Sequence, residues 1–118
     1  MKVMVFVQMD PKDETGAMPS EELLAAMGAY NEELVNAGIM LDVGGLKPTS
    51  EGTRVAFHGG TTSVVDGPFT ESKELVGGFM IVQSSTLDEA IDIIRPWLRI
   101  HHETLEASAS AIEVRRLL

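Results

Sequence analysis

The residue types that could do chemistry gather in one short segment, 66–74. Asp66 and Glu71 offer carboxylates that could serve as a base or a polar anchor, and Lys73 offers an ammonium group. Charged groups held close together shift each other's pKa, which is how many sites tune a proton acceptor. Phe69 adds an aromatic wall of the kind that small-molecule sites combine with a few polar groups. The segment predicts catalytic roles for Asp66 and Glu71, and ligand binding by Lys73 and Phe69.

The same segment also has a purely structural interpretation. In Asp66-Gly67-Pro68 the aspartate accepts backbone hydrogen bonds, the glycine tolerates unusual dihedral angles and the proline fixes the exit of the chain. For Phe69 the structural interpretation is core packing, which is favoured over a pocket wall. Replacing Asp66 with asparagine separates the two interpretations, because loss of binding with an intact fold indicates a site and unfolding indicates a turn.

Two further residues are candidates for ligand binding. Tyr30 lies on the apolar stripe of an expected helix, and its hydroxyl either points into a cleft or finds a partner in the core. Arg54 and His58 fall on the strand face opposite Val55 and Phe57. From there Arg54 could meet an anionic ligand or a dimer partner, or simply form a solvated edge.

Other familiar site patterns are missing from the sequence. His101 and His102 are adjacent, so on a helix they diverge by about 100° and do not form the i, i+4 pair of a metal site. The glycine pairs do not fit a dinucleotide fingerprint, and no phosphate-loop lysine follows them. We therefore expect no metal and no cofactor.

Composition limits the class of protein. The chain has 118 residues with 44% hydrophobic content, which suits one domain over 1–118. Its formal net charge of -9 repels phosphate backbones and anionic lipid surfaces, so we expect neither nucleic acid nor a membrane as partner. The absence of cysteine excludes disulfides and a cysteine nucleophile and is consistent with a cytoplasmic protein.

Apolar patterning indicates alternating strands and helices. The expected elements are a strand within 1–10, a helix over 20–37, a strand over 39–43, a hairpin over 53–66, a helical turn over 70–74, a strand over 79–82, a helix from 86 onward and a strand over 112–115. The hairpin turns at Gly59-Gly60, which pairs Phe57 with Thr62. Pro96 is expected to kink or restart the second helix.

This order favours an α+β fold of the ferredoxin-like type. Right-handed crossovers place two main helices on one face of an antiparallel sheet, with the β-hairpin as an insertion. The other face of the sheet is then apolar and without helices. Because a large exposed apolar face favours association, we expect a homodimer formed through the sheet face.

One run of sequence resembles a known family. The segment Asp66–Glu74 reads DGPFTESKE and is followed by Gly77, Gly78 and Phe79. It is similar to the signature of the DGPF-domain group of YciI-related proteins, and the resemblance covers nearly the whole chain except 97–110. It implies a dimeric α+β barrel type of ferredoxin-like fold. In the better-known YciI branch a helix histidine and an aspartate form a proposed dyad, but residues 20–37 contain no histidine, and Arg95-Pro96-Trp97 stands where the aspartate is expected.

Three functions remain open from the sequence. The first is a cytoplasmic homodimer that binds a small, partly apolar metabolite in a cleft near 66–73, with acid–base catalysis as a further step. The second is a non-enzymatic accessory or regulatory module whose dimer surface or helix engages another protein. The third is a purely structural homodimer. The sequence does not decide whether the protein is an enzyme.

Overall fold

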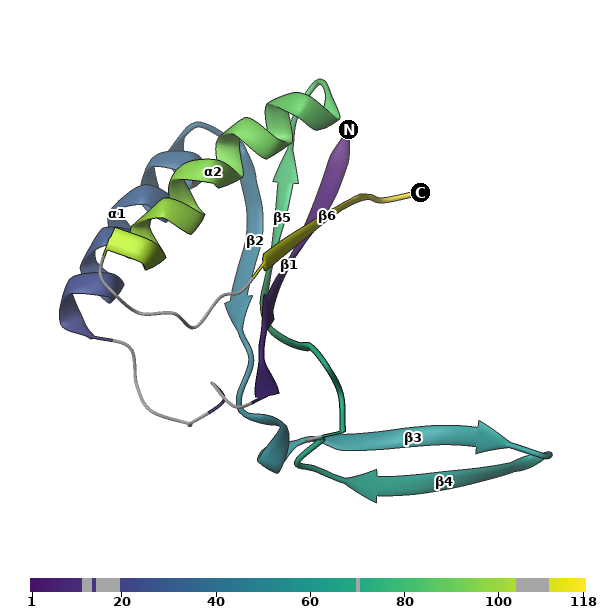
Figure 1. Ribbon diagram of the computed structural model, residues 1–118. Coiled ribbons are helices and arrows are strands. Elements are labelled where there is room, and N and C mark those ends of the chain that lie inside the picture. The colour runs from purple at the N-terminus through teal and green to yellow at the C-terminus, as the bar shows by residue number, and fades with distance from the viewer. Residues whose placement is uncertain (12–13, 15–19, 70, 104–110) are drawn as a thin grey trace.

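The computed structural model describes residues 1–11, 14, 20–69, 71–103 and 111–118, without the side chains of 101–103. It is an α+β structure with a four-stranded antiparallel sheet in the order β2-β5-β1-β6 and a separate two-stranded hairpin, β3-β4 (Figure 1). The strands are β1 (Lys2–Met9), β2 (Met40–Gly45), β3 (Thr53–His58), β4 (Thr61–Asp66), β5 (Leu75–Gln83) and β6 (Ala111–Arg116). The helices are α1 (Glu21–Asn36) and α2 (Leu87–Glu103), and a 3₁₀ turn, η2, spans Thr49–Glu51.

Strand β1 is central in the sheet, as its continuous apolar run predicted. It pairs antiparallel with β5 on one side and with β6 on the other. Val3 and Val5 are completely buried, while the alternate residues Met4 and Phe6 are only partly buried. Alternation along a strand places these two sets on opposite faces of the sheet. The order of strands confirms the predicted ferredoxin-like arrangement.

Both helices cover the same face of the sheet (Figure 1). The Oγ atom of Ser20 accepts the amide hydrogen of Leu23 at 3.1 Å and so caps α1, and Gly38, with a φ of 73°, lies just beyond its C-terminal end. Thr86 caps α2 in the same way, since its Oγ1 accepts from the amide of Glu89 at 3.1 Å. Both caps follow from the sequence patterns.

Pro96 does not end the second helix. Of the two expected outcomes, the restart is wrong, because α2 runs as one element from Leu87 to Glu103 with Pro96 inside it. The kink stays a prediction. A proline removes one backbone donor without preventing the helix from continuing. The flanking side chains Ile94 and Trp97 are both buried in the core, which holds the helix in place on either side of the proline.

The core lies between the two helices and the face of the sheet that they cover. The buried core side chains are Val3, Val5, Leu34, Met40, Met80, Val82, Ala90, Ile94 and Trp97. We call the other side of the sheet the open face. Its central side chains are Met4, Phe6, Phe79 and Ile81, which register as the pairs Met4 with Ile81 and Phe6 with Phe79. Neither α1 nor α2 covers this face.

The hairpin leaves the sheet altogether. Its register pairs Phe57 with Thr62 and Val55 with Val64, which confirms the predicted pairing. Positive φ angles of 56° and 84° at Gly59 and Gly60 form the two-residue turn, and glycine adopts such angles without strain. In Figure 1 the hairpin runs from the base of the sheet toward the side away from the helices.

Candidate functional site

The segment after β4 is held against η2 by its backbone. The amide of Gly67 donates to the carbonyl of Gly52 at 2.9 Å, and the amide of Phe69 donates to Oγ1 of Thr49 at 3.2 Å. A Cβ added at Gly67 would stand 1.7 Å from the carbonyl oxygen of Thr49, so only glycine permits this approach. The Asp66–Phe69 motif therefore has a direct structural role, which is to fix the base of the hairpin.

Arg54 is the centre of a small cluster at this base. Its guanidinium lies over the ring of Phe69, 4.2 Å from the centroid, and its Nη1 donates to Oε1 of Glu71 at 2.6 Å. Its Nη2 donates to Oγ of Ser72 at 3.4 Å. The side chains of Arg54 and Glu71 remain 45% and 64% exposed. We call Arg54, Phe69, Glu71 and Ser72 the arginine cluster.

The electrostatics of the cluster keep Glu71 ionised. A hydrogen bond from its own backbone amide and a second from Arg54 lower the pKa of its carboxyl below the ordinary 4.5. A carboxylate with a low pKa is a weak base that accepts protons only from acidic groups. The cluster can therefore bind an anion through Arg54 and accept a proton from an acidic ligand through Glu71.

Asp66 and Lys73 do not join this cluster. Asp66 faces Thr53 across the hairpin and accepts from its Oγ1 at 3.1 Å. Arg54 is the next residue along β3, so its side chain points to the opposite face of the hairpin. Lys73 forms no ion pair with another described residue. Of the catalytic and ligand-binding residues predicted in this segment, the structure brings together Glu71 and Phe69, along with the separately predicted Arg54.

Residues 71–74 do not form the helical turn that the sequence suggested. The described residues here make a turn closed by the amide of Ser72 donating to the carbonyl of Phe69 at 3.2 Å, and β5 begins at Leu75. A single bond between residues three positions apart closes one turn, and one turn without further bonds does not make a helix. Thr70, the expected cap of this turn, lies outside the described residues.

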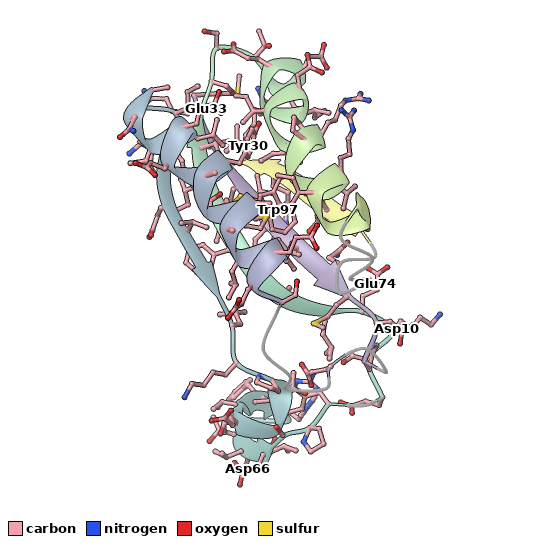
Figure 2. The ribbon with its side chains drawn as sticks, turned by 90° about the vertical axis from the view of Figure 1, so that its left-hand side faces the viewer. Asp10, Tyr30, Glu33, Asp66, Glu74 and Trp97 are labelled. Carbon is pink, nitrogen blue, oxygen red and sulfur yellow. The ribbon has the colours of Figure 1, made fainter. Side chains whose placement is uncertain are left out.

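Tyr30 lies far from the arginine cluster. Its hydroxyl donates to the backbone carbonyl of Ile93, which joins α1 to α2. Burial, and then the negative charge of Glu33, raise the pKa of Tyr30 above 10.0. Figure 2 shows Tyr30 and Trp97 in the helix layer and Asp66 at the other end of the molecule. The two predicted site residues Tyr30 and Asp66 therefore do not share one site.

Sequence reasoning missed three polar residues around the site. Thr49 donates its hydroxyl hydrogen to a carboxylate oxygen of Glu14 while accepting from the amide of Phe69, and so links three segments of the chain. Ser72 is a partner of Arg54. These contacts join residues between 18 and 35 positions apart, and no local pattern in the sequence marks them.

Two carboxylates were also missed at the end of the sheet. Met9 pairs with Leu75, so Asp10 and Glu74, which directly adjoin that pair, lie at the same end of β1 and β5. Figure 2 shows both of them there. Their proximity depends on the β1–β5 register, which shifts between Val7 and Gln8 and could not be derived from the sequence.

Other features of the described residues add no metal or membrane site. An open concavity of about 420 Å³ lies at the chain ends, lined by Met1, Arg115, Arg116, Leu117 and Leu118. Among the described residues no group of three or more histidine or acidic side chains is placed to hold a metal ion. No helix in the described part of the chain is long and apolar enough to cross a membrane. The side chains of His101 and His102 lie outside the description.

The sheet order, the two helices on one face and the inserted hairpin define a ferredoxin-like domain of the dimeric α+β barrel type. Comparison with known proteins makes this assignment specific. The model of the YCII-related domain family matches residues 1–97, and the chain belongs to this family. The resemblance seen in the DGPF segment is confirmed at that level.

Two individual proteins are similar to the chain. An uncharacterised protein of Rhizobium meliloti (strain 1021) is 36% identical over 75 residues, which cover 64% of this chain and 60% of that protein. The solved structure of 5-chloro-2-hydroxyhydroquinone dehydrochlorinase from Burkholderia phenoliruptrix, in complex with 2,5-dihydroxybenzoquinone, matches with a TM-score of 0.50 and 16% identity. That match covers 100% of this chain and 94% of the enzyme. At this identity the likeness shows the fold alone.

Proposed function

We propose that the protein is a homodimer that binds a small anionic metabolite at the arginine cluster. The observation that carries the proposal is the state of Arg54. Its guanidinium is oriented by the Phe69 ring on one side and by Glu71 on the other, yet 45% of the side chain stays exposed. An oriented guanidinium with free donors is a strong partner for a carboxylate or phenolate.

The nature of the ligand follows from the groups around Arg54. The Phe69 ring supplies an apolar wall, so a planar ligand can lie against it while its anionic oxygen meets the guanidinium. The ionised Glu71 beside Arg54 competes with such an anion, or accepts a proton when the ligand arrives as an acid. The enzyme of similar fold is described with 2,5-dihydroxybenzoquinone, a planar and acidic molecule, which supports its use as the first probe.

Binding of 2,5-dihydroxybenzoquinone, followed by calorimetry and by its absorbance, tests the site. Arg54→Ala is expected to weaken binding about tenfold or more, since a charge-assisted contact is lost. Lys47→Ala is the matched control, because Lys47 is also an exposed cation paired with a glutamate, Glu51, at 3.7 Å. It is expected to change binding about twofold at most. Equal affinity in the wild type and Arg54→Ala would refute the site.

Substitution of the two carboxylates locates the chemistry. Glu71→Gln is expected to tighten binding, because the Glu71 carboxylate competes with an anionic ligand for Arg54. Asp66→Asn is expected to leave binding unchanged, because Asp66 lies on the other face of the hairpin. Loss of binding in Asp66→Asn but not in Arg54→Ala would place the site at Asp66 and overturn the present assignment.

The proposed dimer forms through the open face. Met4, Phe6, Phe79 and Ile81 make an apolar centre there, and neither described helix shelters it. Ile81→Lys places a charge in this centre and is expected to give a monomer in sedimentation equilibrium. Val35→Lys is the control, since Val35 is a 52% exposed side chain of α1, which lies on the opposite side of the sheet. A wild-type protein that remains monomeric at high concentration would refute the dimer.

A second candidate function is a non-enzymatic module that engages another protein. It is favoured by the exposed apolar side chains of the hairpin, such as Phe57 at 70% exposure. Affinity purification from the native host separates the two candidates. A stoichiometric protein partner supports the module, whereas its absence together with binding of the quinone supports the metabolite site.

A further inference from the structure

We call the hairpin β3-β4 the arm. Away from the chain ends, it carries the most exposed large apolar side chains among the described residues. Val55, Phe57 and Val64 are 66%, 70% and 67% exposed. Apart from the terminal Leu118, no other large apolar side chain in the described residues exceeds 52%. Such exposure marks a surface that another molecule covers.

These three side chains form one face of the arm. Val55 pairs with Val64, and Phe57 lies two residues further along β3, so alternation puts all three on the same side. Arg54 and His58 lie on the other side. Within the described chain β3 and β4 pack extensively only on each other. A two-stranded hairpin standing alone in water is marginally stable, so this face needs a partner.

The direction of the arm indicates what the partner is. Figure 1 shows the arm extending from the base of the sheet on the side away from the helices, which is the side of the open face. A second copy that packs its open face on this one lies about 10 Å away, the spacing of stacked sheets. Each strand of the arm has 6 residues. At 3.3 Å per residue, an arm of roughly 20 Å extends past the sheet layer of the second copy.

The area required by a stable dimer supports the same partner. A standard interface takes roughly 800 Å² from each protomer. The four central side chains of the open face are partly buried within the protomer. Phe57 is 70% exposed. Because an aromatic side chain carries roughly 150–250 Å², Phe57 alone offers on the order of 100–180 Å². In a two-fold dimer both arms add such area to that of the two open faces.

We propose that each arm packs the face formed by Val55, Phe57 and Val64 against the second copy of the chain. This inference rests on the proposed homodimer and adds a second, separate contact to it. The charged residue on this face is Asp66, which lies at the base of the arm two residues beyond Val64, so the repulsion between two chains of net charge -9 is not concentrated around Phe57. The arm thus contacts the second copy outside the interface between the two sheets.

A pair of neighbouring valines tests the arm. Val64 lies on the apolar face and Val65 on the opposite face, paired with Arg54, and both are exposed. Val64→Ser is expected to raise the dimer dissociation constant about tenfold in sedimentation equilibrium, because a buried apolar side chain is lost. Val65→Ser is expected to change it about twofold at most, as an exposed substitution does.

Thiol reactivity gives an independent measurement. The chain contains no cysteine, so Thr62→Cys beside Phe57 and Ser63→Cys on the other face each carry one thiol. Disulfide exchange with a small aromatic reagent is measured below and above the dimer dissociation constant. On dimerisation the exchange rate of the Thr62→Cys thiol is expected to fall about tenfold, and that of the Ser63→Cys thiol is expected to stay the same. Only the first thiol lies on the face that the second copy covers.

The outcomes separate the arm from the dimer. If the wild type dimerises but Val64→Ser and Val65→Ser have equal dissociation constants and the Thr62→Cys thiol stays reactive, the arm inference is overturned and the dimer stands. If the wild type is monomeric at high concentration, both proposals are overturned. If the Thr62→Cys thiol becomes protected only on addition of a different protein, the second copy is not the partner of the arm.

Discussion

Replacing Gly67 with alanine is expected to open the base of the hairpin while the four-stranded sheet stays folded. The alanine Cβ would stand 1.7 Å from the carbonyl oxygen of Thr49 and 2.6 Å from its carbonyl carbon. Real Cβ contacts essentially never fall below 3.0 Å, so the two segments must separate by about 1.3 Å. The obstacle is backbone and cannot rotate away as a side chain would.

The magnitude follows from the two hydrogen bonds at this point. Separation disrupts the bond from the Gly67 amide to Gly52 at 2.9 Å and the bond from the Phe69 amide to Thr49 at 3.2 Å. Each contributes about 0.5–1.5 kcal/mol, and the steric strain adds about 1–3 kcal/mol. Relative to the wild type, the equilibrium between the closed and open hairpin base therefore shifts toward the open form by about 2–6 kcal/mol. This is at least a roughly 30-fold change in the population of the open form.

Amide hydrogen exchange measures this opening residue by residue. In Gly67→Ala the amides of residue 67 and Phe69, which donate the two disrupted bonds, are expected to exchange about 30-fold faster or more, and the amide of Val5 in β1 at its wild-type rate. Gly45→Ala is the matched control, because a Cβ at Gly45 has no atom within 4 Å. Wild-type exchange at both hairpin-base amides in Gly67→Ala would refute the reasoning.

Three other predictions follow from single contacts. The pKa of Glu71, measured by NMR titration, is expected below 4.5 and to rise only part of the way in Arg54→Ala, because its own amide is the larger cause. Since this pKa is depressed in the folded state, its contribution to stability is present above the unfolded pKa and is lost as pH falls through the lowered value. An unchanged pKa in Arg54→Ala would contradict this. Tyr30→Phe is expected to lower the free energy of unfolding by about 0.5–1.5 kcal/mol in urea. Because the folded-state pKa of Tyr30 is raised, the wild type should lose stability as pH rises from 10.0 through that pKa, and Tyr30→Phe should not. Thr86→Ala removes the cap of α2 and is expected to lower stability by about 0.5–2 kcal/mol in thermal unfolding, whereas Ser85→Ala, which keeps its backbone contact, should not.

The sequence predicted the parts of the fold that local chemistry determines. Gly59-Gly60 between alternating residues specified the hairpin and its register, because few residues other than glycine take positive φ at both turn positions. Ser20 and Thr86 marked the starts of the helices. The order of elements then restricted the sheet to a ferredoxin-like arrangement, since the handedness of the crossovers leaves few alternatives.

Only part of the site could be predicted, because its contacts join residues that are distant in the sequence. Alternation placed Arg54 on the face opposite Phe57, which is confirmed, but its bond to Glu71 joins residues 17 positions apart. The same alternation puts Asp66 on the Val55 face, two residues beyond Val64, and so away from Arg54. Alternation along β4 therefore argues against grouping Asp66 with Glu71, which their nearness in the sequence alone favoured.

The motif segment Asp66–Phe69 connects the two proposals physically. Gly67 and Phe69 fix the base of the arm to η2 through their amides, while the Phe69 ring supports the guanidinium of Arg54. The direction of the arm and the orientation of Arg54 therefore depend on one rigid joint. Substitutions of Gly67 or Phe69 disturb both functions together, so they cannot show which one matters. Arg54→Ala and Val64→Ser lie on opposite faces of the hairpin and outside the joint, and for that reason they resolve ligand binding from dimer contact.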